Sequence, residues 1–302
     1  MLQKIDLPPS LEKIQNGLFK GCTSLQQITI PSSVTSIEHS VFTGCTSLTE
    51  ISLPSSVTNI EHSVFTGCTS LTEIVLPSSV KIIGKYSFHD CSSLIKVSFP
   101  SCLTCIEMYA FCGCSSLEQL SFPSSLEKIG KRAFNDCSSV KEVIINSDSI
   151  DIHNFAFNNC YSIEKVMISS IKVKIEFAAF MKCSKVEKIE IPYLSEIQKD
   201  VFNGCSALSQ FSIPSSVKKI GISAFKDCSS LKQISIPDSV SEICQDAFRG
   251  CSSLKNVSIP SSVKKIESFA FSGCSSLELI SVPHSVKTKY IGIGPNVKVE
   301  LI

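Results

Sequence analysis

Apolar and polar residues alternate over a short stretch that returns throughout the chain. In one copy Leu25, Ile28 and Ile30 are apolar, and Thr29 separates the last two. Alternation with a period of two is typical of a β-strand that buries one face. Each copy therefore predicts one short strand, and strands stacked in sequence order predict one long parallel sheet. The arrangement recurs at Leu48/Ile51/Leu53, Leu71/Ile74/Leu76, Leu94/Val97/Phe99, Leu117/Leu120/Phe122, Val186/Ile189/Ile191 and Leu277/Ile280/Val282.

Proline follows most of these stretches and marks the end of each predicted strand. Pro31, for example, cannot donate a backbone hydrogen bond to a neighbouring strand, so pairing should stop there. Val34, Ile37 and Phe42 then return three apolar side chains to the core, and the remaining length fits turns or single helical turns better than full helices. The repeated phenylalanine predicts an aromatic spine behind the sheet. Its members are Phe19, Phe42, Phe65, Phe88, Phe111, Phe134, Phe157, Phe180, Phe202, Phe225, Phe248 and Phe271.

A cysteine marks each copy at a fixed place. The interval is 23 residues, with a single step of 22. A short fixed period is typical of stacked repeats, in which each unit contacts only its neighbours. We therefore expect one continuous solenoid over residues 1–286 rather than two compact domains. The repeated cysteines are Cys22, Cys45, Cys68, Cys91, Cys114, Cys137, Cys160, Cys183, Cys205, Cys228, Cys251 and Cys274.

We expect the repeated cysteines to be reduced core thiols, because free cysteine is a small and commonly buried residue. Neighbouring rungs lie about 4.8 Å apart, so spacing alone also allows disulfides between them. Four cysteines lie outside the repeated position and are better candidates for exposed or paired thiols, with a local disulfide left open: Cys102, Cys105, Cys112 and Cys244. The first three, with Cys114, superficially suggest a zinc site, but Cys114 belongs to the repeated core position.

The full repeat resembles the BspA-like class of leucine-rich repeat, over residues 2 to about 286. The resemblance implies a leucine-rich repeat solenoid, a right-handed coil of about twelve 23-residue repeats. One long parallel β-sheet would form one face, with turns or short helical turns on the opposite face. Members are cell-surface proteins of bacteria and protists, implicated in adhesion to host proteins such as fibronectin and fibrinogen. One copy reads Leu48-x-x-Ile51-x-Leu53-Pro54-x-x-Val57-x-x-Ile60-x-x-x-Val64-Phe65-x-x-Cys68.

Both ends of the array depart from the repeat. Leu2, Ile5 and Leu7 match the middle of the template, so the chain begins inside a repeat without an N-terminal cap, as a piece of a longer protein would. We expect this uncapped edge to allow self-association, because exposed sheet edges promote pairing between chains. At the other end, residues 290–293 and 297–302 alternate like strands around a Gly-Pro-Asn turn. Residues 287–302 are therefore predicted to form a capping hairpin of the same domain.

Charge and motifs exclude several classes of function. A formal net charge of +1 argues against nucleic acid as a partner, because its binding needs a dense basic surface. The chain has no apolar run of signal-peptide length and none long enough to enter a bilayer. Its histidines and glycines form neither a catalytic constellation nor a phosphate-binding loop. We expect no enzyme activity, no catalytic residue, no metal and no cofactor.

The exposed strand positions form the predicted contact surface, since stacking makes them a broad, preformed platform. Ile144 and Met167 are adjacent apolar members of one outward column that is otherwise rich in serine. They lie where Asn146 and Ser169 replace proline and just before the copy that loses one residue near Pro192, so rung spacing or curvature should change there. An exposed apolar spot rimmed by charge is a typical partner site. The candidate protein-binding residues are Lys141, Glu142, Ile144, Lys165, Met167, Glu187, Lys188 and Glu190.

Two readings of function remain. The family resemblance favours a cell-surface or secreted adhesin-like or receptor-like protein that binds a host or extracellular-matrix protein. The missing signal peptide and the many reduced cysteines favour an intracellular, cytoplasmic scaffold that uses the same face. A second surface is also predicted, because Lys218/Lys219 and Lys264/Lys265 recur at one template position and should lie along one flank. That flank is either solvated or attracts an acidic partner.

Overall fold

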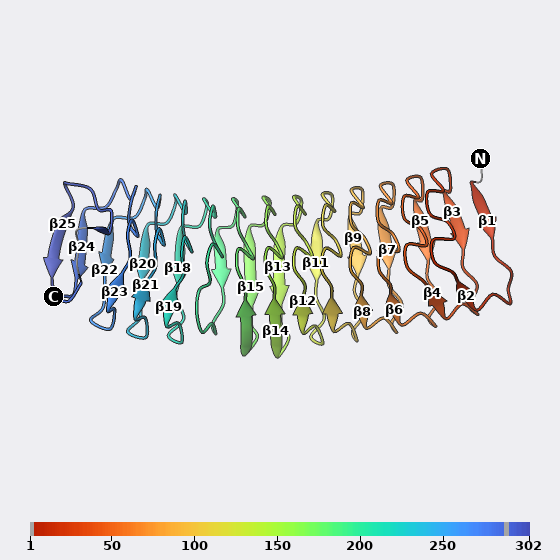
Figure 1. The fold of residues 1–302 in the computed structure, drawn as a ribbon, viewed down its shortest axis with the longest axis horizontal. Coiled ribbons are helices and arrows are strands. Elements are labelled where there is room, and N and C mark those ends of the chain that lie inside the picture. Colours follow the sequence, from red (N-terminus) through yellow and green to blue (C-terminus); the bar gives the residue numbers. More distant parts are fainter. Residues whose placement is uncertain (1–2, 287–289) are drawn as a thin grey trace.

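The repeats stack into an elongated rod with the two ends of the chain far apart (Figure 1). The computed structural model describes residues 3–286 and 290–302. It contains about 13 turns of a parallel β-solenoid, and no α-helix occurs in these residues. The predicted solenoid is thereby confirmed. Leu2, which belongs to the predicted first repeat, and residues 287–289, which belong to the predicted hairpin, lie outside the described residues.

The main strand ladder follows the predicted alternation, with the central residue buried and its neighbours turned outward. Strands pair in parallel with a 23-residue offset, as in Ile28↔Ile51. Pairing is interrupted between β5 and β7 and between β17 and β18. The ladder comprises β1 (Lys4–Asp6), β3 (Gln27–Thr29), β5 (Glu50–Ser52), β7 (Glu73–Val75), β9 (Lys96–Ser98), β11 (Gln119–Ser121), β13 (Glu142–Ile145), β15 (Lys165–Ile168), β17 (Lys188–Glu190), β18 (Gln210–Ser212), β20 (Gln233–Ser235), β22 (Asn256–Ser258), β24 (Leu279–Val282) and β25 (Lys298–Leu301).

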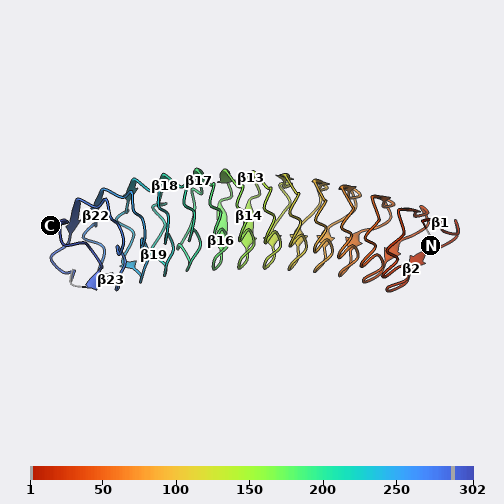
Figure 2. The same ribbon diagram turned by 90° about the horizontal axis from the view of Figure 1, so that it is seen from above.

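A second parallel ladder occupies part of the path that we predicted to hold only turns or short helical turns. It forms because the isoleucine that follows the proline turn, such as Ile37, is buried and stacks on its equivalents. Figure 2 shows these strands set apart from β13, β17 and β18, which lie along one long edge. They are β2 (Lys13–Ile14), β4 (Ser36–Ile37), β6 (Asn59–Ile60), β8 (Ile82–Ile83), β10 (Cys105–Ile106), β12 (Lys128–Ile129), β14 (Ser149–Ile152), β16 (Lys172–Ile175), β19 (Lys219–Ile220), β21 (Glu242–Ile243) and β23 (Lys265–Ile266).

The irregular repeats change the ladders as well as the sequence. Strands β13 and β15 are four residues long where Asn146 and Ser169 replace the proline, and β14 and β16, which follow these residues in the second ladder, are also four residues long. In the copy shortened by one residue, the second ladder is reduced to a single bridge, Ile197↔Ile220. The main ladder is also interrupted there. The expected change in the stacking of the rungs is confirmed at this point.

The aromatic spine is the centre of the core. Successive rings of the twelve phenylalanines lie 4.9–6.2 Å apart between centroids. The widest separation, between Phe180 and Phe202, falls at the shortened repeat. Beside the spine, each column thiol from Cys45 onward donates a hydrogen bond to the carbonyl of the phenylalanine in the preceding rung, as from Cys45 Sγ to Phe19 O at 3.1 Å. The stacked rings and these thiol hydrogen bonds therefore connect neighbouring rungs.

The C-terminal segment is a further rung and not the predicted hairpin. Strand β25 pairs with β24 in parallel, with Ile280 opposite Val299, whereas a hairpin would be antiparallel. Residues 290–293 form no strand, and Ile291 is instead buried in the core. Its carbonyl accepts a hydrogen bond from the backbone N–H of Phe271 at 2.8 Å. The segment thus takes the place of another turn of the solenoid.

Candidate functional site

All eight predicted binding residues lie on or beside strands β13, β15 and β17, on the outward face of the main ladder. Ile144 pairs with Met167 in the strand register, and Met167 pairs with Glu190. The two apolar side chains are half-buried and not fully exposed. The most exposed apolar member of the column is Val75, at 67%. The sequence therefore placed the residues together but overestimated how far Ile144 and Met167 project.

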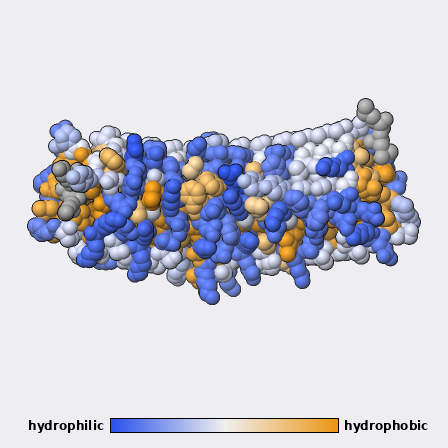
Figure 3. Space-filling model, in the orientation of Figure 1, coloured by the Kyte–Doolittle hydropathy of each residue, from blue (hydrophilic) through white to orange (hydrophobic). Residues whose placement is uncertain are grey.

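The charged neighbours surround this apolar pair closely. Across strands β13, β15 and β17, one row of outward positions holds Glu142, Lys165 and Lys188, and each residue lies opposite the next. Lys188 Nζ lies 2.7 Å from Glu190 Oε1, and both side chains are exposed. In the space-filling view, hydrophilic side chains cover most of the visible face, and apolar patches interrupt them near the middle and at both ends (Figure 3). The arrangement is a mixed-charge surface with a small apolar centre.

Two hollows adjoin the apolar pair. The Ile144 hollow, of about 550 Å³, has a mixed lining of acidic, basic, polar and apolar residues that include Glu118, Lys141 and Phe122. The Met167 hollow, of about 450 Å³, is lined by Met167, Glu190 and apolar residues from the next two rungs, namely Ile191, Pro192, Ile213 and Pro214. None of these four apolar residues was among the binding residues predicted from the sequence. The available signal was the shortened repeat, which changes how the rung containing Pro192 stacks on the next.

A larger groove of about 1100 Å³ runs over β20, β22 and β24 on the same face. Its outward side chains are hydroxyl and amide groups, such as Ser235 and Asn256, with Lys232 and Lys255 at its side. Hot spots of protein interfaces cluster in well-packed, desolvated pockets and favour apolar and aromatic anchors. The smaller Met167 hollow therefore offers a better anchoring point than this larger and more polar groove.

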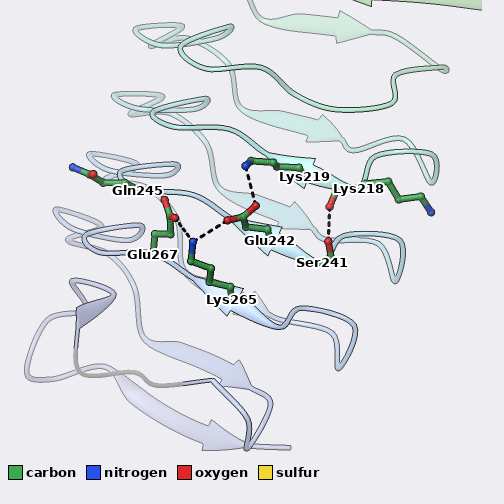
Figure 4. Close-up of polar contacts among 7 residues, drawn as sticks. All are labelled: Lys218, Lys219, Ser241, Glu242, Gln245, Lys265 and Glu267. Carbon is green, nitrogen blue, oxygen red and sulfur yellow. Dashed lines mark hydrogen bonds and ion pairs between the residues drawn. The ribbon is translucent and has the colours of Figure 1, made fainter.

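The predicted lysine flank is an ion-pair ladder (Figure 4). Glu242 lies between Lys219 and Lys265 in the strand register and contacts their ammonium groups at 2.9 and 3.1 Å. Lys265 also pairs with Glu267, which accepts a hydrogen bond from the backbone N–H of Gln245. The hydrogen bonds from Lys219 and Lys265 lower the pKa of the Glu242 carboxyl. Two of the four lysines are thus already neutralised, which weakens the case for an acidic partner on this flank.

Removing the central carboxylate should give a small, pH-dependent loss of stability. Because the folded pKa of Glu242 is lowered, its contribution is present above the unfolded pKa of about 4.3 and is lost as pH falls through the folded pKa. We expect Glu242→Gln to lower Tm at pH 7 and to differ less from the wild type at pH 3, because that contribution falls with pH. Thermal melts at both pH values measure this difference. Glu127→Gln is the control, because Glu127 is exposed and directly precedes strand β12. An equal difference at both pH values would contradict it.

The cysteines are all unpaired but differ in how exposed they are to solvent. All sixteen are free, and Cys112 and Cys244, which we expected to be exposed or paired, are buried at 7% and 2% exposure. Cys102 and Cys105 are half-buried. No cluster of three or more His, Cys, Asp or Glu side chains suited to a metal ion occurs in residues 3–286 and 290–302. The described residues therefore offer no ligand cluster for the zinc site considered from the sequence.

Thiol labelling should separate these cysteines sharply. Burial raises the pKa of Cys45 to about 11 and that of Cys205 to about 12, so little reactive thiolate forms at neutral pH. We expect a short iodoacetamide pulse at pH 8 to modify Cys22, Cys102 and Cys105, the half-buried thiols, well before any other. Peptide mass spectrometry before and after unfolding in urea measures this. Labelling of the column thiols at the rate of the unfolded chain would show that the core is not closed.

A surface ridge on the turn side was also missed by the sequence analysis. Tyr86 and Tyr109 stack at 4.9 Å, and the Arg132 guanidinium lies 5.6 Å from the Tyr109 ring and 5.0 Å from the Phe155 ring. All four residues have positive φ, a backbone conformation that bulky side chains rarely adopt. All four side chains are half-buried, because they pack on one another. We assign the ridge to packing between rungs.

The parallel ladders, the 23-residue period and the buried spine define a leucine-rich repeat solenoid. The chain belongs to the family described as BspA type Leucine rich repeat region (6 copies), whose model matches residues 1–117, 104–231 and 195–293. The predicted family is thereby confirmed. Repeat proteins of this kind present extended surfaces suited to protein–protein interaction. The described residues contain no helix with the length and apolar character needed to span a membrane.

Solved structures agree with this assignment. The chain is similar to a leucine-rich repeat protein from Bacteroides ovatus ATCC 8483, with 29% identity over 99% of this chain and 92% of that chain, at a TM-score of 0.71. It is similar to a leucine rich cell surface protein from Faecalibacterium prausnitzii A2-165, with 27% identity over 92% and 78% of the two chains and a TM-score of 0.53. Pneumococcal vaccine antigen PcpA, at 20% identity over 99% and 84% and a TM-score of 0.55, shares the fold. No curated protein matches the chain.

Proposed function

We propose that this protein is a non-enzymatic protein-binding module, an adhesin-like or receptor-like protein of the cell surface that binds a host or matrix protein. The observation that carries the proposal is the outward face of β13, β15 and β17, where Ile144 and Met167 adjoin two hollows within a charged rim. Similarity to a leucine rich cell surface protein supports the location.

The strand face suits a folded protein partner for a physical reason. Its side chains stand on strands whose backbone is hydrogen-bonded to the rungs on either side, as β15 is to β13 and β17. A partner therefore meets a surface that is already ordered, and association costs little backbone entropy on this side. The apolar centre can be desolvated while the charged rim sets which partners are accepted.

Charging the apolar centre should abolish binding while leaving the fold intact. Met167→Glu places a carboxylate at the edge of the Met167 hollow, where a partner would have to bury it, so we expect binding to fall at least about tenfold. The measurement is solid-phase binding to immobilised fibronectin and fibrinogen. Ser235→Glu, which adds the same charge at the same template position on β20, is the matched control. Equal binding by wild type and Met167→Glu would remove this surface from the proposal.

The alternative is an intracellular scaffold that uses the same face. It is favoured by the sixteen free cysteines, because thiols stay reduced mainly inside cells. Antibody labelling of intact and permeabilised source cells decides between the two locations. Signal on intact cells supports the surface protein, and signal only after permeabilisation supports the scaffold. Self-association through the edge strand β1 stays a prediction, which light scattering over a concentration series tests.

A further inference from the structure

Two lysines lie opposite each other on strands β15 and β17, which also carry Met167 and Glu190 of the Met167 hollow. Lys165 on β15 is directly opposite Lys188 on β17, and neighbouring strands lie about 4.8 Å apart. Like charges directly opposite on adjacent strands are destabilising. Lys188 is paired with Glu190. Lys165, which is half-buried, lies between Glu142 and Lys188 in the strand register but forms no salt bridge with any carboxylate in residues 3–286 and 290–302. The two lysines can therefore pair with one further carboxylate.

The Met167 hollow begins at the next outward position of strand β15 after Lys165. Lys165 and Met167 are two residues apart on β15, and Met167 lines the hollow together with Ile191, Pro192 and Pro214. In an extended chain, alternate side chains point the same way and stand about 6.6–6.8 Å apart. A ligand in extended conformation therefore matches this spacing with one intervening residue between its own two contacts.

We propose that the Met167 hollow and the Lys165/Lys188 pair together bind an extended segment of a protein partner, in which an apolar side chain lies two residues from a carboxylate. The apolar side chain enters the hollow, and the carboxylate lies between the two ammonium groups. The inference rests on the proposed function and specifies what that face recognises.

The surrounding charges limit the ligand to a single carboxylate. Glu190 beside the hollow and Glu187 on the same rung repel a polyanion such as nucleic acid or a run of acidic residues. On the other side of Ile144, the Ile144 hollow is lined by three carboxylates, Glu118, Glu142 and Glu164, against one lysine, Lys141, so its net negative charge disfavours the same carboxylate. The segment is therefore directed to the Met167 hollow.

The test uses dye-labelled peptides of one frame, Gly-Ser-Gly-Leu-Ser-Asp-Gly-Ser-Gly, titrated with the full chain at low ionic strength and followed by fluorescence anisotropy. The comparison peptides replace the central Leu-Ser-Asp by Leu-Ser-Asn, Leu-Ser-Lys or Ala-Ser-Asp. We expect Leu-Ser-Asp to bind about threefold to fivefold more tightly than Leu-Ser-Asn, as a partly exposed ion pair allows. Loss of the leucine side chain should weaken binding about tenfold.

A charge reversal in the protein should reverse the preference among peptides. Lys165→Glu is expected to bind Leu-Ser-Lys more tightly than Leu-Ser-Asp, while Lys96→Glu, the same change at the same template position on β9, keeps the wild-type order. Equal binding of the Asp and Lys peptides by the wild type overturns the inference. So does absence of any binding of the Leu-Ser-Asp peptide up to millimolar concentration. If Met167→Glu still abolishes binding to fibronectin or fibrinogen, the proposed function survives that failure.

Discussion

Phe111→Ala is expected to lower the free energy of unfolding by about 3–5 kcal/mol, the usual range for a large buried aromatic side chain. Phe111 has no exposed surface. Its ring stacks between Phe88 and Phe134, with centroids at 4.9 and 5.2 Å, and meets the edge of Phe99 at 5.8 Å. Truncation removes these contacts and leaves a cavity in the middle of the rod. Hydrogen-bonded rungs on both sides limit how far the structure can collapse into it.

Urea denaturation followed by circular dichroism measures this loss. Phe269→Ala is the control, because Phe269 is 53% exposed and lies outside the spine, so its truncation should cost no more than about 0.5 kcal/mol. Since each rung contacts only its neighbours, the cavity should also reduce cooperativity between the two halves of the rod. A loss of similar size for both variants would show that the spine adds nothing beyond ordinary aromatic burial.

The main ladder and the spine could be predicted because the same chemistry fills the same position in every repeat. A single stretch such as Leu25 to Ile30 is too short to be decisive, but its recurrence every 23 residues removes the ambiguity. The second ladder escaped prediction because strands such as Ser36–Ile37 contain two residues, which cannot show an alternating pattern. Only the stacking of successive rungs makes them strands.

The C-terminal segment shows a different limit of sequence reasoning. Alternation over residues 297–302 correctly indicates a strand, but it is the same for parallel and antiparallel pairing. The turn-like Gly-Pro-Asn sequence favoured a hairpin. In the structure, Ile291 is buried against the core, and β25 pairs in parallel with β24, with Leu279 opposite Lys298, an interval shorter than the 23-residue repeat. The direction of β25 goes with several long-range contacts that the local pattern does not contain, such as the hydrogen bonds from Phe271 N–H to Ile291 O and from Ile302 N–H to Val282 O.

For the candidate site, the sequence could predict which residues share a face but not how deep each one lies. Register alone aligns Ile144 with Met167 and Lys165 with Lys188. Exposure depends on the neighbours: Val75, between Ser52 and Ser98, is 67% exposed, whereas Ile144 and Met167, which lie opposite each other, are half-buried. The Met167 hollow depends on the stacking of the shortened repeat, which no single repeat predicts.

Gly130→Ala is expected to destabilise the protein by about 1–3 kcal/mol, because the added methyl group has no space. A Cβ at Gly130 would lie 2.6 Å from the backbone carbon of Glu107 and from the nitrogen of Met108, and 3.0 Å from the oxygen of Ile106. The same oxygen accepts the hydrogen bond of the Gly130 N–H at 2.7 Å, so relief of the clash would lengthen this bond and part the rungs.

The sign of the effect makes this a strict test of the rung packing. Where space allows, replacing glycine by alanine stabilises a protein by about 0.4–1 kcal/mol, because the unfolded chain loses conformational freedom. Glu107→Ala serves as the control, since it lies at the same template position one rung earlier and already carries a Cβ; its cost should stay within about 0.5 kcal/mol. The readout is the midpoint of urea denaturation. A higher midpoint for Gly130→Ala would show that the two rungs have room to separate, so that close backbone contact does not fix their spacing there.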